Sequence, residues 1–202
     1  MFVRIRKKID ILRHEAGHLV VGKLLGFETG SVRLTAKDAG AEITLAPHLA
    51  DIDQTKDYIK RRVIVLYAGA CAEALRGKKI HEPQVLSDLE SDHATNDFAK
   101  IRELLLLLAG IEIDDDNRQD LLDKYVADYS NRAGELVEKY ADTIHEVAND
   151  LAENISAEGM TLSKDKVDNL PSVRTIKASS ERAASPAPSS VATLTSSAAI
   201  PR

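Results

Sequence analysis

The sequence predicts a mainly α-helical domain with a small β-hairpin or edge sheet after its first helix. Apolar side chains recur at helical spacing through most of the chain, whereas strict alternation is confined to residues 31–35 and 41–45. A segment rich in Ser, Ala and Pro follows residue 168 and offers few large apolar groups to bury. These observations predict one folded domain over residues 1–168 and a disordered tail over residues 169–202.

The first helix is predicted over about residues 7–25, and Gly26 supplies its C-terminal stop. The two alternating segments follow it. Residues 37–40 between them combine Lys, Asp and Gly, a composition typical of a tight turn. The N-terminal part of the chain is therefore expected to form a helix followed by a hairpin or a pair of edge strands.

A second helix is predicted to begin near Asp53 or Thr55 and to continue to about Arg76, before Gly77. Its second half is small and apolar nearly all round, which predicts close packing in the interior. Glu73 lies within that apolar half. It is either a buried carboxylate that needs a partner or a metal ion, or part of a solvated stripe, and the residues alone leave both alternatives open.

The later part of the chain is also predicted to be helical. Ser91 or Thr95 can cap a third helix that contains a run of leucines. The acidic residues 114–116 suit the start of a long helical region. We expect this region to form two helices, with a break near residues 130–134 or near Tyr140.

Composition and charge argue against several classes of function. The chain has a net charge of −5, 4% aromatic residues and no tryptophan, which disfavours nucleic-acid binding. No apolar run approaches the roughly 18 residues of a membrane span, and the basic N-terminus is not followed by the apolar segment of a secretory signal. Cys71 is the single cysteine, so neither an intrachain disulfide nor a cysteine-based zinc site is expected. We expect a soluble, cytoplasmic protein.

Residues 14–18, His-Glu-Ala-Gly-His, form an H-E-x-x-H motif inside the first predicted helix. Because an α-helix has about 3.6 residues per turn, His14 and His18 lie on one face and can supply two ligands to a tetrahedral zinc ion. Glu15 adjoins the same face, where it can take a proton from water at the metal as a general base. The alternative is a pair of surface histidines on an amphipathic helix, and the motif as a whole favours the zinc site.

A catalytic zinc site usually has three protein ligands, so one more is needed. Asp97 would lie in the first turn of the third helix, where the helix dipole favours an ionised carboxylate, and Asn96 could orient it. The alternative is an ordinary aspartate at a helix start, and the residues alone do not decide between the two. The remaining candidates for the third ligand are His48, Glu73, His81, Asp92, His93 and His145.

Four segments resemble the protease domain of the FtsH-type family, the AAA-linked zinc metalloproteases of bacteria and organelles. Residues 14–18 match the H-E-A-G-H of that family, and residues 66–73, Leu-Tyr-Ala-Gly-Ala-Cys-Ala-Glu, are similar to its L-Y-G-G-x-x-A-E helix. Residues 91–97, Ser-Asp-His-Ala-Thr-Asn-Asp, resemble its S-x-G-A-x-N-D element, and Asn-Arg-Ala at 131–133 resembles a later helix. The resemblance covers roughly residues 10–168 in patches.

The resemblance implies a zincin-like helical metallopeptidase domain with one Zn²⁺ per chain, held by His14, His18 and Asp97. It also implies that Glu73 lies close to the metal ion. The family's AAA ATPase module and membrane anchor precede its protease domain, whereas here thirteen residues precede His14 and no Walker A motif occurs. We therefore expect the protease domain only, without the ATPase module or a membrane span.

The predicted function is that of a zinc metalloendopeptidase that hydrolyses peptide bonds of unfolded or flexible proteins, with Glu15 as general base toward a zinc-activated water. Its partners would be the polypeptide substrate and either a separate AAA ATPase or further copies of the chain. Two alternatives stay open. One is a catalytically silent homologue that serves as a binding or assembly module, and the other is an unrelated small regulatory zincin with a third ligand other than Asp97.

Overall fold

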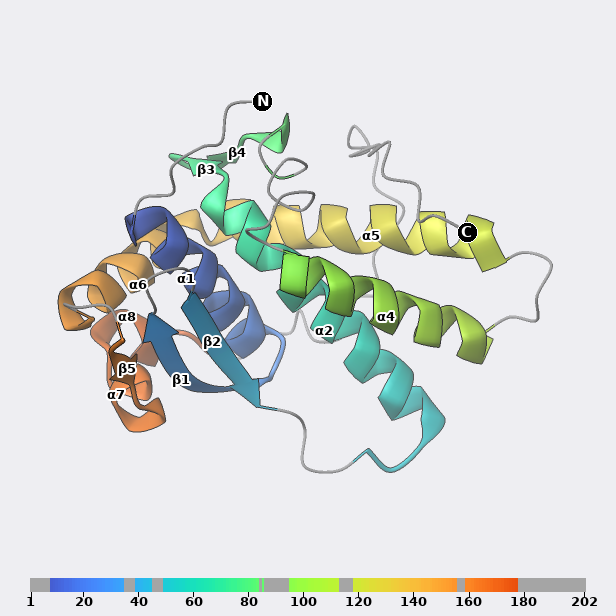
Figure 1. Cartoon of the computed structure of the whole chain (residues 1–202), viewed down its shortest axis with the longest axis horizontal. Coiled ribbons are helices and arrows are strands. Elements are labelled where there is room, and N and C mark those ends of the chain that lie inside the picture. The colour runs from blue at the N-terminus through green and yellow to red at the C-terminus, as the bar shows by residue number, and fades with distance from the viewer. Residues whose placement is uncertain are drawn as a thin grey trace.

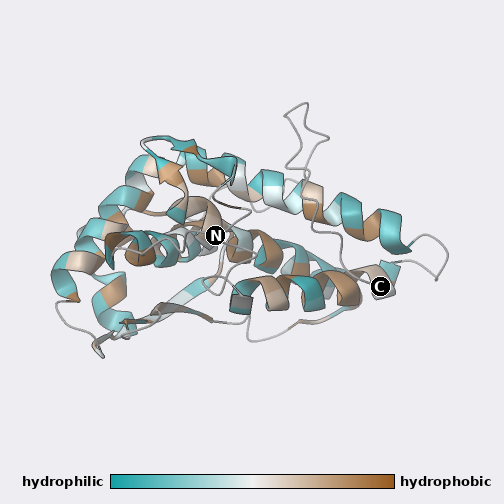
Figure 2. Cartoon of the chain, turned by 45° about the horizontal axis from the view of Figure 1, so that its top comes forward, coloured by the Kyte–Doolittle hydropathy of each residue, from teal (hydrophilic) through white to brown (hydrophobic). Residues whose placement is uncertain are grey.

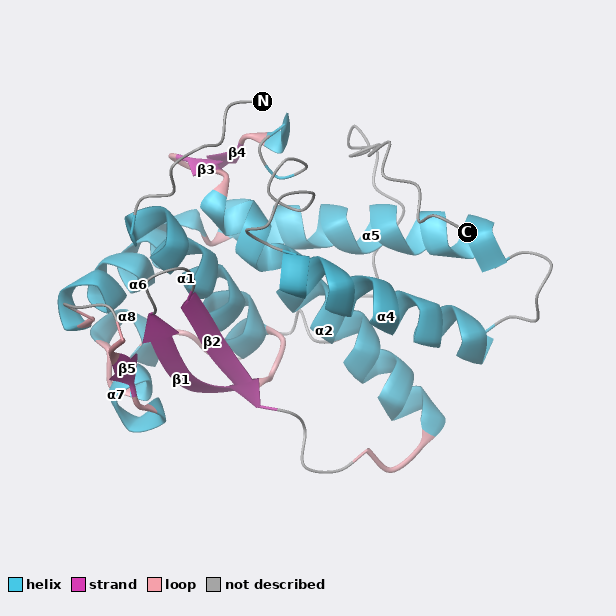
Figure 3. Cartoon of the chain, in the orientation of Figure 1, coloured by secondary structure: helices cyan, strands magenta, loops and turns pink. Residues whose placement is uncertain are grey.

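The structure, a computed structural model, is mainly helical with a small antiparallel sheet after the first helix (Figure 1). It describes residues 8–34, 39–44, 49–83, 85, 95–112, 118–155 and 159–177. The helices within these ranges are α1 (Lys8–Leu24), α2 (Ile52–Glu73), α4 (Thr95–Glu112), α5 (Arg118–Lys139), α6 (Ala141–Asn154), α7 (Lys164–Asp168) and α8 (Pro171–Arg174). The strands are β1 (Glu28–Leu34), β2 (Ala39–Thr44), β3 (Leu75–Arg76), β4 (Lys79–Ile80) and β5 (Thr161–Leu162), drawn in magenta in Figure 3.

Helix α1 is the central element of the core. It packs most extensively against α2 and α6, and it also contacts β1 and β2. Leu12, Leu19 and Val20 of α1 have no exposed surface. This burial on several sides explains why the helix carries apolar residues nearly all round rather than along a single stripe. Helix α1 ends as expected, because Gly26 adopts a positive φ of 80° just after it.

The larger sheet has the strand order β2-β1-β5, with both pairs antiparallel. Strand β1 pairs with β2 from Glu28↔Thr44 to Leu34↔Ala39, and the register shifts between Thr29 and Val32. The expected pair of strands after the first helix is thus confirmed, and a short third strand, β5, joins it on the other side of β1. Ala39 and Gly40 belong to β2, so the second half of the predicted turn at residues 37–40 is strand, and residues 35–38 lie outside the described residues.

The end of the second helix was predicted wrongly. Helix α2 ends at Glu73 rather than at Arg76, and the following residues form the short β3–β4 hairpin. Gly77 lies in the turn of this hairpin with a positive φ of 62°, so it permits a chain reversal instead of ending a helix. Leu75 is buried in the hairpin, which explains why the chain leaves the helix before the glycine.

Helix α4 begins at Thr95, one of the two predicted starts. The long helical region is broken at Tyr140, one of the two predicted breaks, and α5 and α6 lie on its two sides. Figure 2 shows hydrophilic and hydrophobic residues alternating along the long helices. In α6 the apolar positions Ile144, Val147 and Leu151 follow helical spacing and are fully buried, as an amphipathic helix requires.

The predicted domain boundary at residue 168 is too early. Leu170 and Val173 are buried, and the backbone N–H and the hydroxyl of Ser172 donate hydrogen bonds of 3.1 and 2.6 Å to the Asp150 carboxylate on α6. A few apolar and hydroxyl groups are enough to hold α8 against the domain, although the segment around it is rich in Ser, Ala and Pro. Residues 178–202, the rest of the predicted tail, lie outside the described residues. None of the described helices is long and apolar enough to cross a membrane.

Candidate metal centre

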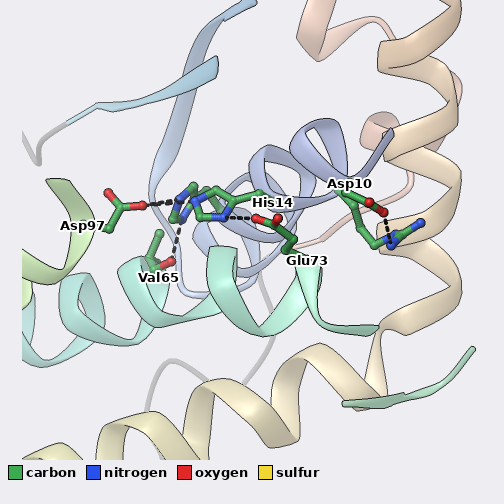
Figure 4. A network of polar contacts seen from close by, with 7 residues as sticks. Asp10, His14, Val65, Glu73 and Asp97 are labelled. Carbon is green, nitrogen blue, oxygen red and sulfur yellow. Dashed lines mark hydrogen bonds and ion pairs between the residues drawn. The ribbon is translucent and has the colours of Figure 1, made fainter. Parts of the chain in front are cut away.

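Three side chains from two helices that are far apart in the sequence come together beside α2 (Figure 4). The Nε2 atoms of His14 and His18 on α1 lie 3.2 and 3.0 Å from the same oxygen, Oδ2 of Asp97 in the first turn of α4. The possible ligand atoms of the three residues all lie within 4.8 Å of one another. The structure therefore brings the two motif histidines together with the aspartate that the sequence singled out.

Each imidazole is oriented through its other nitrogen. His18 Nδ1 lies 2.8 Å from the carbonyl oxygen of Val65, and His14 Nδ1 lies 3.3 Å from Oε2 of Glu73. A carbonyl or an ionised carboxylate only accepts hydrogen bonds, so these two contacts favour a proton on Nδ1 of each ring. With a metal cation in place of a proton between Nε2 and Asp97, each neutral imidazole keeps its proton on Nδ1. This is the tautomer in which Nε2 binds a metal ion.

The donor set fits a zinc ion in chemistry and in spacing. Two imidazole lone pairs and a carboxylate oxygen repel one another unless a proton or a metal cation lies among them. Tetrahedral zinc with bonds of about 2.0–2.1 Å places its ligand atoms roughly 3.3–3.4 Å apart. The separations of 3.2 and 3.0 Å between the histidine nitrogens and Asp97 are close to that value.

The pKa values of His14 and Asp97 are both shifted in the direction that favours a positive charge between them. Burial would lower the pKa of His14, but hydrogen bonds to Asp97 and Glu73 outweigh it and raise the pKa to about 10. Burial would raise the pKa of Asp97, whereas the facing imidazoles of His18 and His14 lower it well below its usual range. The surroundings thus keep the Asp97 carboxylate ionised and stabilise a cation next to it.

Glu15 lies one residue from His14 and lines the same cavity. Its side chain is buried, and its Oε2 accepts a 2.5 Å hydrogen bond from the backbone N–H of Ala41 in β2. Strand β2 is at the edge of the larger sheet. The contact holds the carboxylate at the cavity wall, between the metal centre and the edge strand.

The cavity has a volume of about 270 Å³ and is largely polar. Its charged lining consists of two carboxylates, Glu15 and Asp97, and three basic side chains, Arg33, Arg62 and Lys100. Lys100 Nζ lies 3.6 Å from the other Asp97 oxygen, Oδ1. The remaining lining residues are His14, His18, Ala39, Gly40, Ala41, Ile43, Leu66 and Asn96.

Two glycines let α1 and α2 approach closely enough to build the site. A Cβ atom at Gly69 of α2 would lie 2.5 Å from His18 Nε2 and 2.6 Å from His14 Nε2. A Cβ atom at Gly17 of α1 would lie 2.5 Å from the carbonyl oxygen of Ala68. Both positions therefore exclude any larger residue in this arrangement. Gly69 in particular leaves room for the two imidazoles.

The other candidates for the third ligand fare differently. Glu73 is buried against His14 as an orienting group, which removes the alternative of a solvated stripe. Asn96, which was expected to orient Asp97 and not to bind the metal, is exposed beside the cavity. His81 is exposed, and His145 is bonded to the carbonyl of Gly77, away from this cluster. His48, Asp92 and His93 lie outside the described residues.

Sequence reasoning missed Arg62 and the role of Gly69. Both lie on the face of α2 that carries Glu73, because residues 62, 66, 69 and 73 follow one another at steps of four, three and four. Helical periodicity counted back from Glu73 would therefore have found them. Comparison with known protein families finds no match to this chain, and comparison with curated protein sequences finds none either.

Proposed function

We propose that this chain is a zinc metalloendopeptidase domain of the zincin type, similar to the protease domain of the FtsH-type family. One observation carries the proposal. The lone pairs of His14 and His18 and the carboxylate of Asp97 converge at one point, with the Glu15 carboxylate on the wall of the same cavity. A pure metal store has no need of a second carboxylate placed beside its ligands.

His14, His18 and Asp97 would hold the ion, while Glu73 and the Val65 carbonyl keep both imidazoles in the binding tautomer. Zinc bound there supplies Lewis acidity, which lowers the pKa of a water molecule to near 7 and polarises a peptide carbonyl. The carboxylate of Asp97 supplies the negative charge that two neutral imidazoles lack.

Glu15 acts as the general base. Its carboxylate takes the proton from the attacking water and then passes it to the amine that leaves when the peptide bond breaks. The hydrogen bond from the Ala41 N–H holds one oxygen of Glu15 in place.

The substrate would be an extended polypeptide. Strand β2 is an edge strand, and edge strands can pair with an added peptide through backbone hydrogen bonds. A cavity of about 270 Å³ accommodates a short extended segment rather than a folded surface. Unfolded or flexible proteins are therefore the proposed substrates, delivered by a separate AAA ATPase or through an oligomer where a fold must first be opened.

Metal analysis combined with casein digestion tests the proposal. The purified protein should hold one zinc per chain, digest casein, lose both metal and activity with a chelator, and regain both with added zinc. Glu15→Gln should keep zinc but lose activity by roughly 10²–10⁴-fold, the usual contribution of a general base. Asp97→Asn should lose tightly bound zinc, because it removes the charge of the third ligand.

The same measurements identify the alternatives. Zinc binding without casein digestion in the wild type would indicate a binding or assembly module. Full zinc content in Asp97→Asn would place the third ligand elsewhere, as expected of an unrelated zincin. Wild-type digestion by Glu15→Gln would remove Glu15 from the mechanism.

A further inference from the structure

Arg62 lies on the face of α2 that lines the metal centre, and its side chain forms part of the cavity wall. The Nη1 atom is buried and has no hydrogen-bond partner among the described residues. Asp97, the acidic side chain that could serve it, is engaged with His14, His18 and Lys100 instead. The guanidinium therefore keeps hydrogen-bond donors that no described group accepts, on a side chain that lines the site.

This arrangement has an energetic cost that an anion would relieve. Burial lowers the pKa of Arg62, and its neighbours Tyr58 and Asp97 offset this only in part. An arginine nevertheless stays protonated in proteins, so the positive charge persists in the cavity. A buried charge and a buried N–H without a partner both oppose folding, which indicates that the group is kept to bind something.

The charge of the whole cavity points the same way. Arg33 and Lys100 lie in its wall with Arg62, against the two carboxylates Glu15 and Asp97. A divalent cation held by the metal centre would add further positive charge. The cavity would then be strongly positive in a chain whose net charge is −5, and would attract anionic groups.

We infer that Arg62 binds a carboxylate of the peptide substrate. The inference rests on the proposed peptidase function and names the class of substrate that the same site takes. The planar guanidinium matches the two oxygens of a carboxylate and can bind both of them. In a peptide this carboxylate is either the free C-terminus or an acidic side chain near the cleaved bond.

Quenched fluorescent peptides separate the two sources. One set carries a single glutamate at successive positions of a neutral alanine and leucine frame, each with a matched glutamine peptide. A second set differs only in a free or an amidated C-terminus. The kcat/KM of one acidic set should exceed that of its neutral partner by about tenfold or more, as charge-assisted hydrogen bonds typically provide.

Variants assign this preference to one side chain. Arg62→Met removes the guanidinium and should bring the ratio of kcat/KM for acidic over neutral peptides to about one, whereas Arg62→Lys should leave an intermediate ratio. Arg61→Met is the matched control, because the neighbouring arginine bonds Asp57 and the Leu25 carbonyl and does not line the cavity. It should keep the wild-type ratio.

A ratio near one in the wild type, or an unchanged ratio in Arg62→Met, overturns the inference while the cleavage of neutral peptides still supports the proposed function. An equal loss on acidic and neutral peptides also overturns it, because Arg62 would then act on the reaction itself. If no peptide is cleaved, the proposed function fails. Calorimetry of the zinc-loaded protein with the same peptides then shows whether acidic peptides bind and whether Arg62→Met abolishes that binding.

Discussion

At the residue scale, the candidate metal centre depends on groups that are not among its candidate ligands. The Val65 carbonyl and the Glu73 carboxylate each lie beside an imidazole Nδ1 and favour a proton there, which leaves Nε2 available to a metal ion. Gly69 contributes by having no side chain at all. The geometry of three ligands is thus set by three positions on α2, a helix that carries none of them.

Gly69→Ala tests this dependence on α2. The added Cβ atom would overlap both imidazoles, at 2.5 Å from His18 Nε2 and 2.6 Å from His14 Nε2, while the Nδ1 contacts restrict any rotation away from it. We expect zinc affinity to fall by at least the roughly 10–100-fold that changes around metal ligands usually cost. Competition with a chromogenic chelator measures this affinity.

Gly110→Ala is the matched control, because the same change in α4 meets no atom within 4 Å. It should leave zinc affinity unchanged and stabilise the helix by about 0.5–1 kcal/mol. Wild-type zinc affinity in Gly69→Ala would mean that the imidazoles can move aside and that the close approach is not required.

At the scale of elements, a cluster of charges fixes the short helix α7 to the rest of the domain. Asp168 at the end of α7 pairs with Lys23 of α1 at 3.2 Å and with Lys164 at 2.9 Å, and it accepts a 3.1 Å hydrogen bond from the Thr29 hydroxyl of β1. Lys164 also donates to the Thr29 carbonyl. One carboxylate therefore links three elements.

Asp168→Asn should show the energetic effect of this cluster through its pH dependence. Burial would raise the pKa of Asp168, but its bonds to Lys164, Lys23 and Thr29 outweigh it and lower the pKa. A carboxyl group whose pKa is lower in the folded state stabilises that state at pH values above its unfolded pKa of about 3.9. This stabilisation is lost as the pH falls through the pKa of the group in the folded state.

The variant should therefore be less stable than the wild type by about 0.2–1 kcal/mol at pH 7, since the group is only partly buried. The difference should shrink as the pH falls below about 4. Denaturant unfolding at pH 7 and pH 3 measures both values. A difference that stays constant with pH would assign the effect to packing instead of charge.

At the scale of the whole molecule, the site exists only because the chain folds back on itself. The two histidines and Asp97 are separated by 83 and 79 residues, and α2 lies beside both of the helices that carry them. The same folding gathers Arg33, Arg62 and Lys100 around one cavity of an acidic chain. Local sequence features supply the groups, and the packing of α1 and α4 against α2 brings them together.

Truncation tests where this fold ends. Removal of residues 171–202 eliminates buried Val173 and the two hydrogen bonds from Ser172 to Asp150, so it should destabilise the domain by about 2–4 kcal/mol. That corresponds to a fall in Tm of roughly 5–15 °C for a chain of this size. Removal of residues 178–202 alone is the control and should leave Tm nearly unchanged, because their composition offers little to bury. Equal Tm values for both truncations would show that α8 adds no stability.

The sequence alone predicted the mainly helical fold, the pair of strands after the first helix and most residues of the candidate metal centre. Helical spacing and a terminal glycine predicted the first helix, and helical spacing left Tyr140 as one of two expected breaks in the long helical region, because these signals are local in the chain. His14, His18 and Glu15 follow from one motif of five residues on one helix. Asp97 came from the resemblance to a known family, since a helix-start aspartate by itself carries no distinguishing signal.

Only the tertiary structure decided what depends on contacts between distant segments. It placed Glu73 against His14 instead of in solvent, it turned the residues around Gly77 into a hairpin, and it extended the fold through α8. It also showed that Gly69 makes room for the imidazoles and that Arg62 reaches the cavity. These outcomes are set by close packing and by the hydrogen bonds that buried polar groups must find, neither of which is encoded in the local pattern of a single segment.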